Sequence, residues 1–129
     1  MGKQPNVTPS LKTARGLGSA KEGTDHWWMQ RLSALAMMVL APLMIFLVIT
    51  LIGEPYHVVV AKMSSPLWGG ITLLFVCASF YHAHLGLQVV IEDYIGGHAA
   101  RLMLIIVIRA ALIVLGLIAS LSVIRIMLT

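Results

Sequence analysis

The chain has 129 residues, of which 59% are hydrophobic and 11% are charged. Soluble domains are about half apolar and about one quarter charged, so this composition indicates a membrane protein with no room for a soluble catalytic domain. Because Cys77 is the single cysteine, an internal disulfide and a multi-cysteine metal site are excluded. The net charge of +4 does not indicate a nucleic-acid partner, because the basic residues gather before the first apolar run.

Residues 1–30 are polar and rich in glycine and proline, and we expect them to form an extended arm on the cytoplasmic side of a membrane. The first apolar run begins too late and is too long for a signal peptide. The rest of the chain, residues 31–129, is predicted to form one membrane-anchor domain. The chain therefore divides into a polar arm and a single apolar domain.

Three apolar runs in the second part predict three membrane-spanning helices. They cover about residues 32–52, 67–91 and 102–128. Pro42 lies inside the first run and predicts a kink, which membrane helices tolerate. The connections, 53–66 and 92–101, are short, so neighbouring helices should run antiparallel. The predicted fold class is an all-α membrane protein with three transmembrane helices.

Lysine and arginine are unevenly distributed about these spans. Those expected on one side are Lys3, Lys12, Arg15, Lys21, Arg31 and Arg101. The other side holds Lys62 and Arg125. The positive-inside rule then places the N-terminus in the cytoplasm, or in the matrix of an organelle, and the C-terminus outside. Aromatic residues mark the predicted interfaces, with Trp27, Trp28 and Tyr94 inside and Trp68 outside.

The second predicted span contains two histidines, His82 and His84. Ionisable side chains at membrane depth are costly, so they indicate a functional site. His82 precedes Glu92 by ten residues, or about 15 Å along a helix, which puts it near the middle of the membrane. Imidazole at that depth suits a haem iron. The alternative is that both histidines form hydrogen bonds between helices.

His82 and His84 cannot ligate the same iron, because two residues on a helix point about 200° apart. The face of His82 carries small residues that let a flat macrocycle approach, namely Ala78, Ser79 and Gly86. The face of His84 carries side chains able to form hydrogen bonds, namely Cys77, Tyr81 and Gln88. His82 is therefore the preferred ligand. Because no other span carries a deep histidine, a second histidine ligand has to come from another chain.

Polar residues also occur near the inner ends of the spans. Tyr94 offers a phenolic donor, and Asp93 can orient it or pass protons, although an interfacial anchor is the alternative. Arg31 opens the first span as a positive-inside anchor. Arg109 lies about 12 Å beyond Arg101 along the third span, where it snorkels inward or pairs with an acid or carbonyl. The sequence assigns no role to Arg109.

Two motifs together resemble a known family. The run His82-Ala83-x-Leu85-Gly86, followed by Asp93-Tyr94, resembles the hydrophobic membrane anchor of succinate dehydrogenase, respiratory complex II. The segment from Gly16 to Thr24, which leads into His26-Trp27-Trp28-Met29-Gln30-Arg31, resembles the bacterial branch of that family. The resemblance extends from about Arg15 to the end of the third span.

The resemblance implies a role for each matched position. His82 stands where the family has an axial ligand of haem b, and the companion cytochrome b subunit supplies the second ligand. Tyr94 stands where a tyrosine donates a hydrogen bond to ubiquinone, with Asp93 beside it. Arg31 matches an arginine near the haem propionates, and His26 is a further candidate there. His84 and Arg109 match no functional position.

The resemblance also implies a non-autonomous enzyme subunit in the bacterial inner membrane. A flavoprotein subunit would oxidise succinate, and an iron–sulfur subunit would pass the electrons to ubiquinone, linking the tricarboxylic acid cycle to the respiratory chain. The expected surroundings are these subunits and membrane lipid, with no nucleic acid. The alternatives are an anchor of another quinone-linked enzyme such as fumarate reductase, a proton-coupled transporter subunit and a purely structural subunit.

Overall fold

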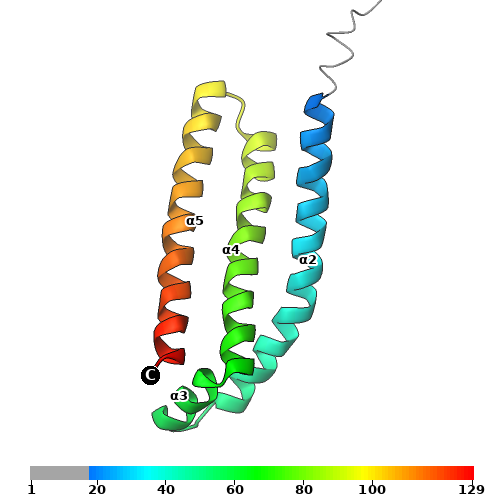
Figure 1. Ribbon diagram of the computed structural model, residues 1–129. Helices are drawn as coiled ribbons and strands as arrows, with labels where there is room; N and C mark the ends of the chain where they lie inside the picture. The colour runs from blue at the N-terminus through cyan, green and yellow to red at the C-terminus, as the bar shows by residue number, and fades with distance from the viewer. Residues whose placement is uncertain (1–17) are drawn as a thin grey trace, which may run out of the picture.

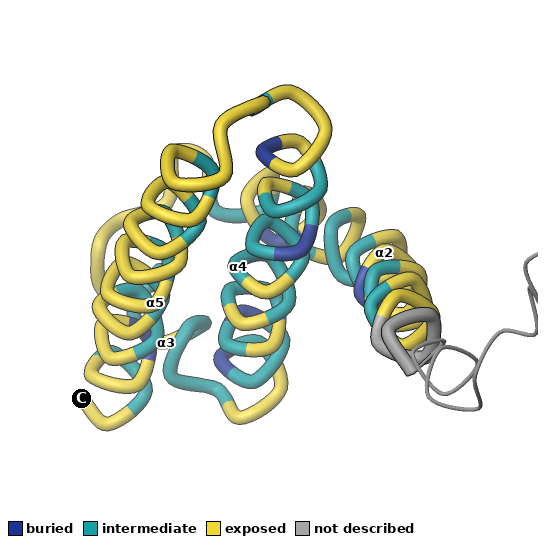
Figure 2. Tube along the Cα trace, turned by 90° about the horizontal axis from the view of Figure 1, so that it is seen from above, coloured by how far each residue is buried: buried dark blue, intermediate teal, exposed yellow. Residues whose placement is uncertain are grey.

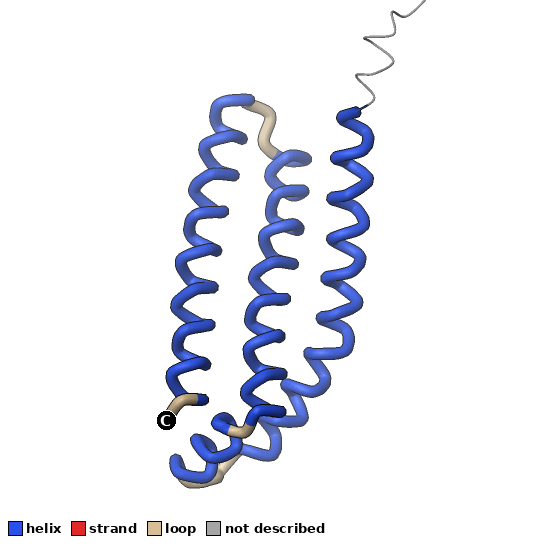
Figure 3. Tube along the Cα trace, viewed as in Figure 1, coloured by secondary structure: helices blue, strands red, loops and turns tan. Residues whose placement is uncertain are grey.

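The computed structural model describes residues 18–129, which form four helices. These are α2 (Gly18–Leu51), α3 (Tyr56–Ser64), α4 (Pro66–Tyr94) and α5 (His98–Met127). Helices α2, α4 and α5 are long and apolar enough to cross a membrane. They stand side by side with α4 in the middle, and the short α3 lies at the end of the bundle near the C-terminus (Figures 1 and 3). The predicted all-α fold with three transmembrane helices is confirmed.

Helix α2 begins well before the predicted first span. Residues 18–30 were expected to belong to an extended arm, and that expectation is wrong for them because they are helical. The apolar segment that follows provides a formed helix on which these residues continue the hydrogen-bond ladder. Gly18 and Gly23 cost only about 1 kcal/mol each in such a helix. Residues 1–17 of the predicted arm lie outside the described residues.

The ends of the helices gather at two opposite ends of the bundle. The start of α2, the end of α4 and the start of α5 lie at one end, whereas α3 and the C-terminus lie at the other (Figure 1). Neighbouring spans are therefore antiparallel, as the short connections predicted. Helix α2 contains Pro42 and changes direction in its lower half (Figure 1), as expected where a proline removes a backbone donor.

Helix α3 lies within the connection 53–66 and was not predicted. Gly53 ends α2 with a φ of 82°, a left-handed conformation that glycine adopts without strain. A nine-residue helix is too short to be stable alone. It is held in place because the Ser64 hydroxyl donates to the Ile126 carbonyl of α5 at 2.9 Å. Ser65 then caps α4 by accepting from the Trp68 backbone N–H at 3.4 Å.

Three helices meet closely at Gly69 of α4. A Cβ atom there would lie 2.6 Å from the Met63 carbonyl oxygen of α3 and 2.7 Å from Cγ of Met127 in α5. Distances this short leave no room for a side chain. Gly70, the next residue, has no atom within 4 Å of an added Cβ. The absence of a side chain at Gly69 therefore lets α3, α4 and α5 approach one another.

The outer surface of the described helices is largely unburied (Figure 2). Within the apolar window of each span, the buried share is 6% in α2, 11% in α4 and 0% in α5. Apolar side chains cannot face water over such an area, so lipid or other protein chains must cover them. The described helices are therefore surrounded by lipid, by other protein chains or by both.

Candidate functional site

His82 lies at the junction of α2 and α4, where a hydrogen bond joins the two helices. Its Nδ1 atom is 2.8 Å from Oγ of Ser33, a residue 49 positions earlier in the chain. Ser33 is buried, with 8% of its surface exposed. The Ser33 hydroxyl also lies 2.9 Å from the Gln30 carbonyl one helical turn back. A buried polar contact of this kind fixes how α2 and α4 are rotated relative to each other.

An open cavity of about 330 Å³ lies beside His82. Its lining residues are Trp27, Gln30, Arg31, Ala34 and His82. The Arg31 guanidinium carbon sits 4.6 Å from the centre of the Trp27 ring, so a cation–π contact holds the arginine at the rim. The structure thus brings predicted residues His82 and Arg31 together, one able to bind a metal and the other able to bind an anionic group.

His26 is not among the residues that line this cavity. Its Nε2 atom is buried and has no hydrogen-bond partner among the described residues. Because buried polar nitrogens are normally paired, Nε2 of His26 is available for a group from outside the described residues.

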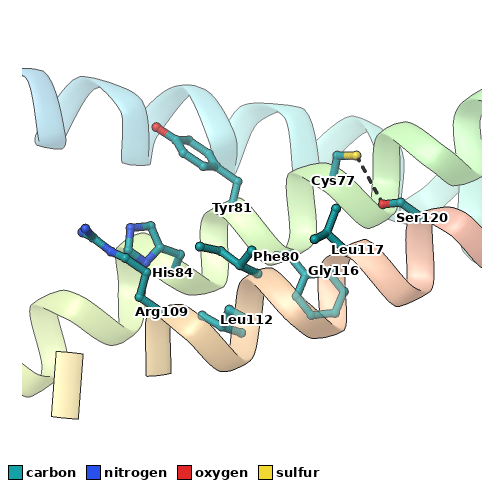
Figure 4. A pocket seen from close by; sticks show the side chains of 10 residues that line it. Cys77, Phe80, Tyr81, His84, Arg109, Leu112, Gly116, Leu117 and Ser120 are labelled. Atoms are coloured by element: carbon teal, nitrogen blue, oxygen red, sulfur yellow. Dashed lines mark hydrogen bonds between the residues drawn. The ribbon is translucent and has the colours of Figure 1, made fainter. Parts of the chain in front are cut away.

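His84 faces a different junction from His82. It lines an open groove of about 590 Å³ between α4 and α5, and Figure 4 shows it beside Arg109. Cys77 and Tyr81 line the same groove, as the helical spacing predicted for the face of His84. Cys77 Sγ lies 3.8 Å from Ser120 Oγ of α5. The two deep histidines of α4 therefore point into separate sites.

Arg109 is the cationic residue of this groove. Its side chain is exposed, and it has no ion pair or hydrogen bond with any residue of the described range. It extends alongside the His84 ring in Figure 4. The remainder of the groove is mainly apolar, with Phe80, Leu112 and Leu117 along its walls.

Tyr94 and Asp93 lie at the end of α4, apart from the His82 cavity. Tyr94 is 82% exposed, and Asp93 is also exposed. Neither side chain is hydrogen-bonded to another described residue. Tyr94 follows His82 by twelve residues, which is about 18 Å along the helix. Both groups therefore face outward at one end of the bundle, where another chain can contact them.

The connection after Tyr94 is rigidly held. Arg101 donates from Nε and Nη2 to the Ile95 carbonyl at 3.1 and 2.9 Å. Six residues before Tyr94, Gln88 donates from Nε2 to the Glu92 carboxylate at 2.9 Å. These contacts stabilise the backbone at the end of α4, which carries Tyr94.

Ser33 and Trp27 are site residues that sequence reasoning missed. Trp27 was interpreted only as an interfacial aromatic, yet it lines the cavity and stacks on Arg31. Ser33 carries a hydroxyl at the start of an apolar span, two residues after Arg31. That isolated hydroxyl was the available signal, because a polar group inside a membrane helix needs a partner.

Fold and site together define a multi-pass helical membrane protein with a histidine, His82, near the middle of its central helix. The comparison with protein families identifies it further. The family described as succinate dehydrogenase/fumarate reductase transmembrane subunit matches residues 5–119, so the chain belongs to this family. It is accordingly a subunit of an oxidoreductase complex and associates with other subunits. The resemblance drawn from the motifs is confirmed.

Individual relatives agree with this assignment. The succinate dehydrogenase hydrophobic membrane anchor subunit of Paracoccus denitrificans is 41% identical over 91 residues, 70% of each chain. The protein of the same name in Rickettsia conorii is 34% identical over 102 residues, 78% of this chain and 81% of the relative. The succinate dehydrogenase membrane anchor subunit of Reclinomonas americana is 30% identical over 95 residues, 69% of this chain and 77% of the relative.

Proposed function

We propose that the chain anchors a succinate:ubiquinone oxidoreductase in the bacterial inner membrane, supplying one axial ligand of haem b and part of the ubiquinone site. The observation that carries the proposal is the position of His82. It lies deep in the middle helix of a chain of this family, beside a cavity whose rim carries Arg31. Neither a structural subunit nor a transporter requires that pairing.

The residues around the cavity fit haem b. His82 would ligate the iron, and Arg31 would bind a propionate through charge-assisted hydrogen bonds. The cavity is bounded by α2 and α4, and among the described residues His82 is its one histidine. The second axial ligand would therefore come from a cytochrome b subunit packed over the cavity. Haem b, when bound, accepts and releases single electrons.

The exposed end of α4 fits a quinone site shared with other subunits. Quinone reduction adds two electrons and two protons, so the site needs a donor that stabilises negative charge on oxygen. The Tyr94 hydroxyl would donate a hydrogen bond to a ubiquinone carbonyl oxygen, and Asp93 would hold a proton beside it. An iron–sulfur subunit, carrying electrons from the flavoprotein subunit, would dock at this end.

The proposal is tested by purifying the native complex through an affinity tag on this chain. We expect flavoprotein and iron–sulfur subunits to co-purify, a b-type haem spectrum, and succinate-dependent reduction of ubiquinone. A colourless preparation without those subunits would instead favour a transporter or structural role. Comparing succinate oxidation with quinol-dependent fumarate reduction in the same preparation separates the succinate dehydrogenase from a fumarate reductase.

We also propose that the N-terminus is cytoplasmic, from the lysine and arginine distribution. Single cysteines are introduced as His98→Cys and Lys62→Cys in a Cys77→Ser background, because Cys77 is otherwise the chain's one thiol. A membrane-impermeant thiol reagent added outside should label position 62 and not position 98. Labelling at position 98 alone would show the opposite topology.

A further inference from the structure

The Ser33 hydroxyl has two hydrogen-bonding neighbours but one proton. Its Oγ lies 2.9 Å from the Gln30 carbonyl oxygen and 2.8 Å from Nδ1 of His82. A carbonyl oxygen can only accept, so the hydroxyl proton is directed at Gln30. Oγ then meets His82 with a lone pair, and the second hydrogen bond forms only if Nδ1 of His82 donates.

This assignment fixes the tautomer of His82. A neutral imidazole carries one N–H, so a proton on Nδ1 leaves Nε2 with the free lone pair. Nε2 is thus the nitrogen able to bind a metal, in a side chain that lines the cavity with Arg31. If Ser33 instead donated to Nδ1, the proton would be on Nε2 and the Gln30 contact would be lost.

We infer that Ser33 is a positioning residue that holds His82 in the tautomer and ring orientation in which Nε2 faces the iron, an inference that rests on the proposed haem ligation. Its backbone contact to Gln30 fixes the hydroxyl rotamer, and its burial at 8% exposure excludes competing water. Partners of the second imidazole nitrogen orient metal-binding histidines and raise their basicity. A more basic ligand stabilises ferric over ferrous haem.

A second serine provides the matched control. Ser79 of α4 also contacts α2, with its hydroxyl 3.4 Å from Sδ of Met37 and 2.6 Å from the Phe75 carbonyl. It therefore resembles Ser33 in using a backbone carbonyl one turn back and in touching the neighbouring helix. The sequence placed Ser79 on the face of His82, but the structure turns its hydroxyl toward Met37: Ser79 makes no hydrogen bond to His82 and does not line the cavity beside it. A purely structural loss of α2–α4 contact should thus affect both serines alike.

The experiment compares Ser33→Ala, Ser33→Thr and Ser79→Ala in the intact complex, with haem content and haem midpoint potential as readouts. Loss of the acceptor in Ser33→Ala should weaken haem retention about 10- to 100-fold and raise the potential. Each tenfold change in the ratio of ferric to ferrous affinity corresponds to about 59 mV. Ser33→Thr retains the hydroxyl and should restore wild-type values, and Ser79→Ala should leave both unchanged.

Several outcomes would overturn the inference. A wild-type midpoint potential in Ser33→Ala would refute this inference and leave the proposed function intact. Equal shifts of the midpoint potential in Ser33→Ala and Ser79→Ala would do the same. If Ser33→Ala lost haem entirely, the threonine variant decides: haem at the wild-type potential supports the inference, and its loss contradicts it. A wild-type complex without haem would refute the proposed function and this inference with it.

Discussion

The two junctions of α4 differ in their chemistry, although each contains a histidine from the same turn of the helix. At the α2–α4 junction, His82 is hydrogen-bonded to buried Ser33. At the α4–α5 junction, His84 lines a mainly apolar groove and has no hydrogen bond with the described residues. Depth in the membrane is nearly the same for both. The rotation of about 100° per residue therefore decides which neighbouring helix each histidine faces.

The arginines beside the two histidines also differ in their surroundings. Arg31 stacks on Trp27 at the rim of the His82 cavity, whereas Arg109 is exposed beside His84 without a partner in the described range. A cation held by an aromatic ring keeps a defined position for an anionic ligand. The α2–α4 junction thus places a held arginine beside a hydrogen-bonded histidine, whereas the α4–α5 junction contains an open, mainly apolar groove beside Arg109.

Removing each histidine in turn is expected to give the largest contrast. His82→Ala should abolish the wild-type haem spectrum, because it removes an axial ligand. His84→Ala should leave iron coordination intact. Visible and electron paramagnetic resonance spectra of the two purified complexes measure this. The reverse pattern would move the site to the α4–α5 groove.

Tyr94→Phe tests a third position on α4, away from both junctions. It retains the ring and removes only the hydroxyl, so quinone reduction should fall about ten- to a thousand-fold. Succinate oxidation by a soluble artificial acceptor should survive, because that chemistry lies in other subunits. Unchanged quinone reduction would make Tyr94 an interfacial anchor, and an equal fall in both assays would indicate failed assembly.

A matched pair of arginine variants compares the junctions by charge. Arg31→Gln should weaken haem retention about 10- to 100-fold, because a hydrogen bond to a charged group contributes about 1.5–3 kcal/mol. Arg109→Gln should leave haem retention at the wild-type level. Haem loss to an excess of apomyoglobin measures both. Equal losses would indicate that the two arginines act through overall stability.

Stability should depend on close packing at the end of the bundle where α3, α4 and α5 meet. Gly69→Ala forces a Cβ against the Met63 carbonyl and Met127, which should cost about 1–3 kcal/mol. Gly70→Ala adds the same methyl group in open space and should be neutral or slightly stabilising. Thermal unfolding midpoints of the two complexes in detergent check this difference. A destabilised Gly70→Ala complex would instead point to a partner chain at that face.

The three spans were predictable because the hydrocarbon core demands long apolar helices. Their boundaries were not, since α2 extends back to Gly18 through polar residues that hydropathy assigns to an arm. Helix α3 was missed for a different reason: a nine-residue helix depends on tertiary contacts such as Ser64 with Ile126. Hydropathy indicates which segments are apolar enough to lie in lipid, but it contains no information about contacts between distant segments.

The site was predictable to the level of helix faces. Helical spacing alone separated His82 from His84 and grouped Cys77 and Tyr81 with His84, as the structure shows. The contact of Ser33 with His82 depends on how α2 is rotated and shifted against α4, over a separation of 49 residues. A single sequence does not show that register, so the contact of Ser33 with His82 could be found only from the structure.

Chemical rescue tests the central claim, that His82 binds the iron, most directly. In the His82→Gly complex, the side chain is replaced by a space that free imidazole can enter. We predict that adding imidazole restores the wild-type haem spectrum in this variant and has no effect on His84→Gly. Retention of a wild-type spectrum by His82→Gly before any imidazole is added would contradict the account.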